Sequence, residues 1–171
     1  DRWLICASPE RFLKKTGTQL LSQPIKGTAG RNPGNPEEDR LNKESLFKSA
    51  KDRAENVMVV DLVRNDLSRV CKEGSVKVDE LYGIYSFPQV HQMISTVSGE
   101  LNEETTISQI LKAIFPMGSM TGAPKKRVMQ LIEQYERTRR GIFSGALGYI
   151  DPQGDFDFNV VIRSIMYNQE D

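Results

Sequence analysis

The fold is indicated most clearly by a hairpin near the end of the chain, GALGYIDPQGDFDFNVVIRSIMY, residues 145–167. Two runs of strand-forming residues, 145–150 and 155–167, flank the turn signal Asp151-Pro152-Gln153-Gly154. In the second run apolar and polar residues alternate, as they do in a strand with one buried face. The stretch therefore predicts two antiparallel strands.

The rest of the chain predicts further strands and three helices. Short apolar runs bounded by turn residues predict strands at 3–7, 19–25, 76–78, 82–87 and 89–99, the first two flanking a turn at Thr16-Gly17. A long helix is predicted from about Glu37 through Leu67, and its buried stripe at helical spacing is Phe47, Ala50, Ala54 and Val57. Helices are also predicted at 107–115 and after Pro124, which is placed in a first turn. The class is α+β with a mainly antiparallel sheet.

Composition excludes several classes of protein. The 171 residues carry 23 Lys and Arg against 23 Asp and Glu, so no basic excess indicates nucleic-acid or membrane binding. The two cysteines have no metal-ligand spacing, which favours a reduced, cytoplasmic protein. Both ends of the chain read as core strands, which suggests a piece of a longer protein.

Lys26 lies in the run QPIKGTAGR, residues 23–31, between a proline and two glycines. The proline fixes one backbone angle, and Gly27 and Gly30 allow conformations that a side chain would forbid, so the segment can hold an amine beside a ligand. Lys26 is therefore either a solvated surface charge or a positioned cation or nucleophile. Glu10, at another strand end, is its candidate partner for proton exchange if burial shifts a pKa; otherwise the two form a surface pair.

Two further candidates are less distinctive. Asp52 and Glu55 lie one helical turn apart, which suits one carboxylate as a Mg²⁺ ligand, although salt bridging along the helix explains the same spacing. His91 is the only histidine. Strand alternation places it on one face with Gln89 and Met93, either as a satisfied residue or as a group that polarises a substrate oxygen.

A loop of small residues, GSMTGAPK at 118–125, leads into the last predicted helix. Gly, Ser and Thr before a helix N-terminus favour anion binding, and the Walker A order is absent, so a carboxylate fits as well as a phosphate. Helix capping alone explains the pattern equally well. Arg163 is placed in a strand, where a bare charge is costly to bury, so it needs an anionic partner.

These segments occur in the order typical of one family. They are ASPERF (7–12), PIKGT (24–28), KDRAEN (51–56), DLVRNDL (61–67), GSMTGAPK (118–125) and GALGY (145–149). The chain resembles the chorismate-utilising enzymes, which include the anthranilate, aminodeoxychorismate, isochorismate and salicylate synthases. The resemblance implies a fragment of their two-sheet antiparallel β-sandwich with outer helices. Residues 1–171 are then the C-terminal part of a single chorismate-binding catalytic domain, truncated at both ends.

Lys26 separates subfamilies, because PIKGT resembles the aminodeoxychorismate synthases, whereas anthranilate synthases typically carry alanine there. The resemblance implies amination of chorismate to 4-amino-4-deoxychorismate. Lys26 would be the nucleophile at C2, Glu10 the general acid/base and His91 a group near the leaving hydroxyl. The implied substrate-binding residues are Thr28, Ser119 and Thr121, with Tyr149 and Arg163 on the enolpyruvyl carboxylate.

The resemblance also implies Mg²⁺ as cofactor, with Glu55 as one ligand, and a glutamine amidotransferase subunit as the ammonia source. The family's later glycine-rich segment and the glutamates that complete the metal site are absent from this sequence, so the chain alone is expected to be inactive. Two alternatives stay open: anthranilate or isochorismate as the product, and a non-catalytic protein that binds chorismate.

Overall fold

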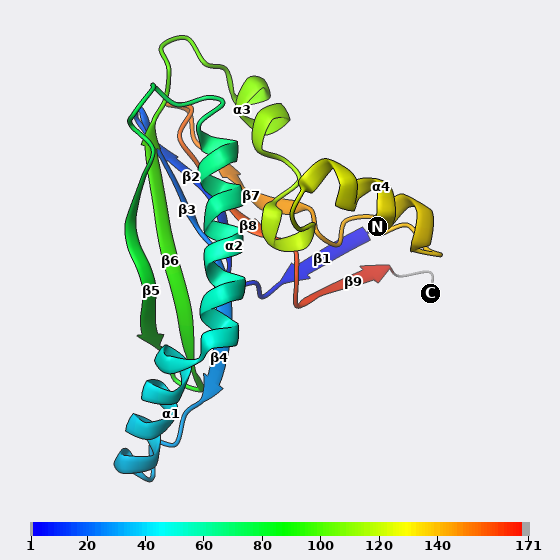
Figure 1. Ribbon diagram of the computed structural model, residues 1–171. Coiled ribbons are helices and arrows are strands. Elements are labelled where there is room, and N and C mark those ends of the chain that lie inside the picture. The colour runs from blue at the N-terminus through cyan, green and yellow to red at the C-terminus, as the bar shows by residue number, and fades with distance from the viewer. Residues whose placement is uncertain (1, 169–171) are drawn as a thin grey trace.

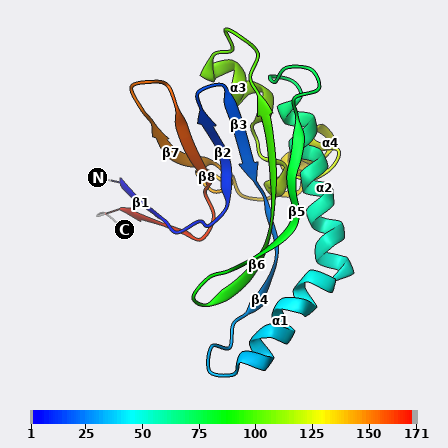
Figure 2. The same ribbon diagram turned by 90° about the vertical axis from the view of Figure 1, so that its left-hand side faces the viewer.

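The computed structural model describes residues 2–168, as one large antiparallel sheet with helices on one face and a separate two-stranded ribbon (Figures 1 and 2). The strands are β1 (Arg2–Cys6), β2 (Arg11–Thr16), β3 (Gln19–Gln23), β4 (Ile25–Gly30), β5 (Lys77–Ser86), β6 (Val90–Glu100), β7 (Ala146–Ile150), β8 (Phe156–Val160) and β9 (Ser164–Asn168). The helices are α1 (Pro36–Lys48), α2 (Ala50–Leu67), α3 (Ile107–Ile114), the 3₁₀ helix η1 (Gly118–Met120) and α4 (Lys125–Tyr135). The α+β class with antiparallel sheets is confirmed.

Strand β6 is the centre of the large sheet. One edge of β6 pairs with β5, and the other pairs with β4 and, further along, with β3. Pro24 separates β3 from β4 because proline has no N–H for the ladder, although its carbonyl still accepts the Ser95 N–H at 3.2 Å. The predicted strand at 19–25 is therefore two strands along one edge. Beyond β3 the sheet continues through β2, β8 and β7.

Two more strands differ from the prediction. Strand β2 was missed, because its Arg and Lys residues hide the apolar pattern. They are partnered across the sheet: Arg11 Nε lies 2.9 Å from Asp157, and Lys15 Nζ lies 2.8 Å from Asp155. Residues 77–86, predicted as part of two short strands, form the single strand β5, which β-bulges interrupt against β6.

The long predicted helix is broken at Ser49. Ser49 has an extended backbone, ends α1 and caps α2 by accepting the Asp52 N–H at 3.3 Å. The predicted buried stripe was wrong for the same reason, since the break changes the phase of the helix, and Phe47 is 48% exposed. The side chains that α1 and α2 bury are Leu46, Asn56, Val59, Val60, Asp66 and Leu67.

The core lies between the sheet and the helices α2 and α3. Val60 and Leu67 of α2 share one cluster with Leu13, Val97 and Ile110 from the strands and α3. Each such side chain contributes about 1.5–3 kcal/mol when it is fully buried. Figure 2 shows α1 and α2 running along the same face of the sheet. The core therefore fixes α2 against the strands that carry the candidate site.

The hairpin at 145–167 is confirmed in its first half only. Strands β7 and β8 pair in register from Ala146 opposite Val160 to Ile150 opposite Phe156. After Val160 the chain leaves the sheet, and Arg163 adopts a positive φ of 48°. Residues 164–168 then form β9, which pairs with β1 in the separate ribbon. Trp3, Ile5, Ile165, Met166 and Tyr167 of this ribbon are all exposed.

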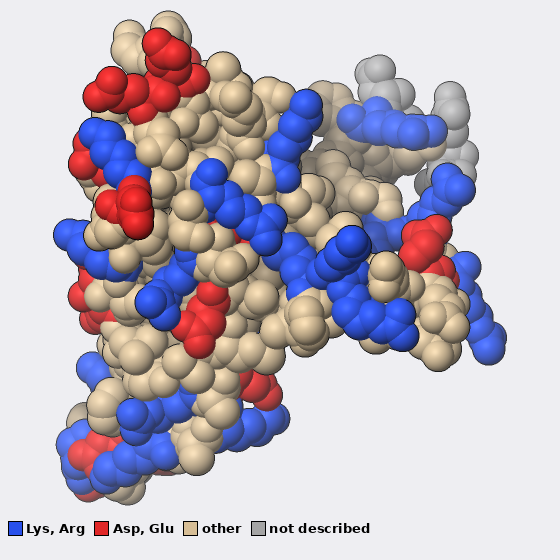
Figure 3. All heavy atoms as spheres, turned by 45° about the horizontal axis from the view of Figure 1, so that its top comes forward, with Lys and Arg blue, Asp and Glu red and all other residues tan. Residues whose placement is uncertain are grey.

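Helix α4 projects from the large sheet in Figure 1. Pro124 has an extended backbone and is the N-cap of α4, so its placement in the first turn was wrong. Lys and Arg side chains predominate on the surface around α4 in Figure 3, and residues 125–140 hold Lys125, Lys126, Arg127, Arg137, Arg139 and Arg140 against Glu133 and Glu136. The zero net charge therefore conceals a locally basic surface. None of the helices in the described range has the length and apolar character needed to cross a membrane.

Candidate active site

Glu10 is held in a buried position at the start of β2. The backbone fixes it, because its carbonyl accepts the Val160 N–H at 3.0 Å and its N–H donates to Ser8 Oγ at 3.3 Å. Its side chain is 6% exposed. Burial raises the pKa of the Glu10 carboxyl above its usual value, and the Ser119 hydrogen bond and the Lys26 charge oppose this rise only in part. Glu10 is therefore poised to keep a proton.

Lys26 reaches the same place from β4. Its Nζ donates to the Ser119 carbonyl at 3.4 Å, and its charge acts on the Glu10 carboxylate. The β4 ladder is irregular between Ile25 and Thr28, so the segment that carries Lys26 bulges out of the sheet. Gly27 has φ +95°, and a Cβ there would meet Asp52 Cβ and Leu46 Cδ1 at 3.0 Å each. The glycine after Lys26 is thus required both by the backbone and by the close approach of the helices.

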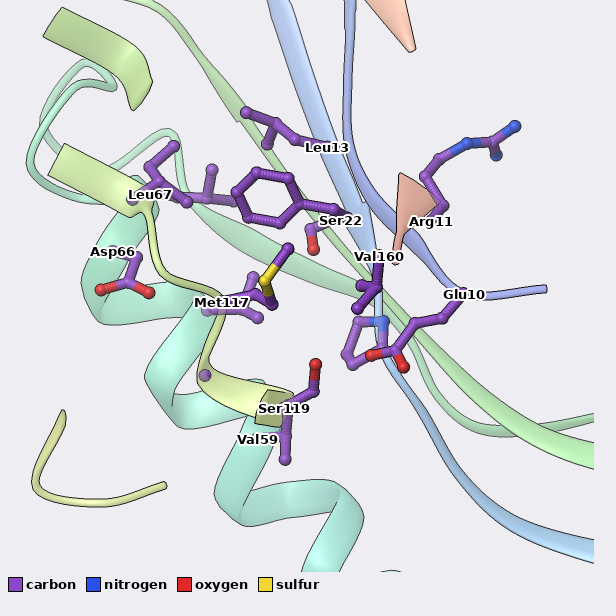
Figure 4. A pocket seen from close by; sticks show the side chains of 15 residues that line it. Glu10, Arg11, Leu13, Ser22, Val59, Asp66, Leu67, Met117, Ser119 and Val160 are labelled. Atoms are coloured by element: carbon purple, nitrogen blue, oxygen red, sulfur yellow. The ribbon is translucent and has the colours of Figure 1, made fainter. Parts of the chain in front are cut away.

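A small cavity adjoins Glu10. It has about 20 Å³ of space, which is enough for roughly one water molecule. Apolar side chains make up most of its wall, and its polar side chains include Glu10, Ser22, Asp66 and Ser119. Figure 4 shows the Glu10 carboxylate and the Ser119 hydroxyl on facing sides of this space. An organic substrate is far too large for the cavity, so a substrate has to approach Glu10 and Lys26 from outside it.

The loop that carries Ser119 is fastened to α2 by an ion pair. Lys125 Nζ donates to the Asp66 carboxylate and to the Ile114 carbonyl, the latter at 2.9 Å. The Asp66 side chain is only 4% exposed. Burial raises the Asp66 pKa, and the hydrogen bond from Lys125 counteracts that rise. This clamp holds η1, and with it Ser119, against the helix.

His91 lies in a second, separate polar group. Its Nδ1 is 2.9 Å from Ser86 Oγ and its Nε2 is 3.2 Å from Asp39 Oδ1. Arg31 donates to the Asp39 carboxylate, with Nη2 to Oδ2 at 2.9 Å, and these bonds hold the Asp39 pKa down at about 2. His91 is 1% exposed. The structure therefore assigns both ring nitrogens of His91 to protein partners.

The candidate metal ligand Glu55 lies on the exposed side of α2. Its side chain is 48% exposed and lies 4.0 Å from Lys51 Nζ, a loose contact along the helix. Asp52, one turn earlier, packs instead against Gly27. Within residues 2–168, no group of three or more His, Cys, Asp or Glu side chains is arranged to hold a metal ion. Among the described residues Glu55 is thus an exposed carboxylate that no cluster of further metal-binding side chains accompanies.

The remaining predicted residues are only partly brought together. Arg163 is exposed, so its predicted burial in a strand was wrong, but its charge is close enough to lower the Glu10 pKa. Thr121 Oγ1 donates to the Met117 carbonyl at 3.1 Å. The hydroxyl proton of Thr121 is therefore used in a hydrogen bond within the loop. Thr28 is exposed opposite Gln92 on β6, and Tyr149 is 65% exposed on β7. Tyr149 is neither a wall of the cavity nor one of the groups that shift the Glu10 pKa.

Three polar residues were missed from the sequence. Asp39 and Asp66 looked like ordinary helical acids, and only the fold shows that each is partnered by a distant residue. Asn56 is fully buried, and its Oδ1 accepts Ser95 Oγ at 2.5 Å. Its Nδ2 has no hydrogen-bond partner within the described residues, which is unusual for a buried amide. The available signal was the position of Asn56 one helical turn after Asp52, which packs against Gly27, and one turn before Val59 and Val60, which are buried.

The geometry supports acid/base and nucleophilic chemistry at one place. A primary amine, a buried carboxyl with a raised pKa and a hydroxyl meet where β2, β4 and η1 converge. A carboxyl with a raised pKa is better suited to give a proton to a leaving group than an ordinary glutamate is. The amine can attack an electrophilic carbon beside it.

Comparisons with known proteins show the family of the chain. The chorismate binding enzyme family model matches residues 1–171, and the chain belongs to this family.

Two curated relatives carry the same activity name. "Aminodeoxychorismate synthase component 1" of Escherichia coli K12 is 45% identical over 162 residues, which is 95% of this chain and 36% of that protein. The Bacillus subtilis protein of the same name is 45% identical over 165 residues, which is 96% of this chain and 35% of the relative. The chain thus spans about a third of the length of these relatives.

Solved structures share the fold. Anthranilate synthase component I of Streptococcus pneumoniae superposes with a TM-score of 0.87 at 34% identity, over 99% of this chain and 37% of that one. The isochorismate synthase MenF of Escherichia coli superposes with a TM-score of 0.85 at 21% identity, over 98% of this chain and 38% of that one, which shows the fold alone.

Proposed function

We propose that this chain is the lysine-bearing part of an enzyme that aminates chorismate to 4-amino-4-deoxychorismate. The observation that carries the proposal is the meeting of Lys26 with the buried, proton-retaining Glu10 at Ser119. The relatives named aminodeoxychorismate synthase support the choice of product. Because the chain spans about a third of them, the activity is proposed for the complete protein.

Lys26 is proposed to act as a covalent nucleophile. Its neutral nitrogen forms a bond to C2 of chorismate, the ring double bonds shift, and the C4–O bond breaks. Glu10 gives its proton to the departing oxygen, which leaves as water. Ammonia then adds at C4, the double bonds shift back, and Lys26 leaves as the neutral amine. The new ammonium at C4 returns one proton to the Glu10 carboxylate, which restores the acid. One difficult displacement is thereby divided into two easier ones.

Charge and position support this division of roles. Burial disfavours the ionised form of Glu10 and raises its pKa, which favours Glu10 as the proton donor. Lys26 rests against a carbonyl oxygen and not against a carboxylate, so a substrate can draw it away at the cost of one long hydrogen bond of 3.4 Å. Arg163, on the exposed side of Glu10, is proposed to bind a substrate carboxylate together with Tyr149 and Thr28. Ser119 and Thr121 line the loop side of the same site.

Mg²⁺ is proposed as a cofactor with Glu55 as one ligand. An exposed carboxylate in a loose contact with Lys51 is free to bind a hard cation. The described residues offer no further acidic partners in a cluster, so substrate oxygens, water or other parts of the protein have to complete the coordination. When bound, Mg²⁺ supplies positive charge that binds and neutralises a substrate carboxylate.

The ammonia donor and the compartment are proposals of the same kind. A glutamine amidotransferase is proposed to supply ammonia, because the second step consumes one nitrogen that chorismate does not carry. The cytoplasm is proposed as the location, since Cys6 and Cys71 are both free thiols.

The experiment that tests this function uses the full-length protein with chorismate, ammonium and Mg²⁺. Chromatography with mass detection separates 4-amino-4-deoxychorismate from anthranilate and isochorismate. We expect 4-amino-4-deoxychorismate as the product. Anthranilate or isochorismate as the main product would overturn the proposed substrate chemistry, and tight chorismate binding without turnover would make the protein a non-catalytic binder.

The metal proposal has its own measurement. In the full-length protein, Glu55→Gln should raise the Mg²⁺ concentration for half-maximal activity by at least the ~10- to 100-fold that loss of a supporting partner costs. Asp61→Asn is the matched control, because Asp61 is another exposed acid of α2, paired with Arg64 at 2.9 Å. An unchanged Mg²⁺ requirement in Glu55→Gln would remove Glu55 from the metal site.

A further inference from the structure

The polar group around His91 shows how one residue depends on another that no sequence pattern singled out. Asp39 on α1 and Ser86 on β5 contact opposite nitrogens of His91 on β6. We propose that Asp39 is a positioning residue for the amination reaction: it holds His91 as the tautomer protonated on Nε2 and fixes the imidazole ring beside β4. This inference rests on the function proposed above.

The ionisation of Asp39 determines the tautomer. Its Oδ1 accepts three donors, the Asn32 N–H at 2.8 Å, Arg31 Nε at 3.1 Å and His91 Nε2 at 3.2 Å. A carboxylate with these partners is ionised at neutral pH and can only accept hydrogen bonds. His91 Nε2 therefore has to carry the proton. In the neutral ring Nδ1 is then an acceptor, and the Ser86 hydroxyl donates to it.

Three chain segments lock the ring in place. His91 is opposite Ala29 in the β4 ladder, a few residues from Lys26 on the same strand, and opposite Ser86 in the β5 ladder. Asp39 is itself fixed by Arg31, whose Nη1 also donates to the Phe87 carbonyl at 3.1 Å. A ring with both nitrogens engaged and 1% exposure cannot turn without breaking these bonds.

This arrangement changes the role of His91 in the reaction. The Nε2 proton of His91 is bound by Asp39, so it is not free for the departing hydroxyl, and that step is proposed for Glu10. His91 is proposed to act through its fixed position on β6, the strand that pairs with the strand carrying Lys26. Removal of Asp39 frees Nε2, so the ring can adopt either tautomer and is held by the Ser86 hydrogen bond alone.

The test uses the full-length protein and a double-mutant cycle. Asp39→Ala should lower kcat by about 10- to 100-fold, the loss typical of partners that orient a functional residue, while KM for chorismate changes by less than about 3-fold. In a His91→Ala background, adding Asp39→Ala should cause little further loss. Asp39→Glu should restore part of the activity. Glu37→Ala is the matched control, since Glu37 is also an Arg-paired acid in the first turn of α1.

A spectroscopic reading makes the outcome independent of activity. The ¹⁵N shifts of His91, assigned by their loss in His91→Ala, should show Nε2 protonated in the wild type and a tautomer mixture in Asp39→Ala. Asp39→Asn, which keeps the shape of the side chain, serves if Asp39→Ala does not fold. An equal loss of kcat with and without His91, or an unchanged tautomer in Asp39→Ala, would overturn the proposal. A wild type that forms no 4-amino-4-deoxychorismate would overturn the proposed function only, and the ¹⁵N shifts would still decide the role of Asp39.

Discussion

The two polar groups of this protein differ in how completely their hydrogen bonds are satisfied. In the group around His91, Asp39 accepts from Arg31, Asn32 and His91, and both His91 nitrogens are occupied. In the group around Ser119, Lys26 Nζ has a single hydrogen-bond partner among residues 2–168, a carbonyl at 3.4 Å. A polar group whose hydrogen bonds are all made within the protein keeps its side chains in fixed positions. A group with unused donors and a shifted pKa can still form hydrogen bonds to a substrate.

The largest effect is expected from Lys26→Ala, because it removes the proposed nucleophile. Formation of 4-amino-4-deoxychorismate by the full-length enzyme should fall by several orders of magnitude, as measured by product chromatography. The control is Lys14→Ala, which removes the amine of a partly buried lysine on β2. Lys125→Met does not serve as the control, because Lys125 holds the loop that carries Ser119. Undiminished amination by Lys26→Ala would show that Lys26 is not the nucleophile, and that unused hydrogen-bond donors do not identify the reactive polar group.

The next largest effect is expected from Glu10→Gln, which should change kcat and the free energy of unfolding in opposite directions. Glu10→Gln should lower kcat by about 10²- to 10⁴-fold, because the amide cannot protonate the leaving oxygen. The same change should raise the free energy of unfolding at pH 7. The folded pKa of Glu10 lies above 4.5, so the folded state binds more protons than the unfolded state, and wild-type stability falls as the pH rises through this window.

Denaturant titrations at several pH values test the second half of this prediction. The stability advantage of Glu10→Gln should be present at neutral pH and should vanish below pH 4.5, where the carboxyl is protonated in both states. A variant that is less stable than the wild type at pH 7 would contradict the raised pKa.

A third change addresses the loop that joins Ser119 to the fold. Lys125→Met leaves the buried Asp66 carboxylate without its partner, and the free energy of unfolding should fall by on the order of 3 kcal/mol. Lys126→Met, an exposed neighbour, should change it by less than about 0.5 kcal/mol. Urea unfolding of both variants gives the comparison. Equal stabilities would show that the clamp contributes nothing to the position of η1.

The smallest effect is expected at Gly27. Gly27→Ala forces an alanine to φ +95° and presses its Cβ against Asp52 and Leu46, which should cost about 1–3 kcal/mol and displace Lys26. Gly30→Ala is the control, because a Cβ there meets nothing within 4 Å. The free energies of unfolding and the kcat values of both variants decide the matter. Similar losses in the two would mean that the bulge tolerates a side chain.

The sequence predicted the parts of the fold that are encoded locally. The turn at Asp151-Pro152-Gln153-Gly154, the apolar run of β6 and the short helix at 107–114 follow from neighbouring residues, and all three are present. Ser49 and Arg163 are different, because each interrupts an otherwise regular pattern with one residue. Nothing in the apolar spacing around them signals the break, since the backbone of each is set by what the next segment packs against.

The candidate site was predicted unevenly for a similar reason. Glu10 and Lys26 belong to recognisable segments, so the sequence indicated them, but their meeting at Ser119 depends on the fold. Asp39 was missed because an acid in the first turn of a helix is ordinary, and its partner His91 lies 52 residues away. Tyr149 was placed near the substrate by resemblance, and the structure describes it on an exposed edge strand.

The ribbon of β1 and β9 also has a consequence for folding. It joins Arg2 to Asn168, so the pairing closes a loop that contains all the other described strands and helices, and contacts of such large sequence separation form slowly. A two-stranded ribbon with exposed faces opens at low cost, and its amides should exchange with deuterium earlier than those of β6. Arg163 lies at the base of β9, and its charge lowers the Glu10 pKa. The ribbon thus lies next to a charge that acts on Glu10, so local opening of the ribbon that displaces Arg163 would remove one of the groups that lower the Glu10 pKa.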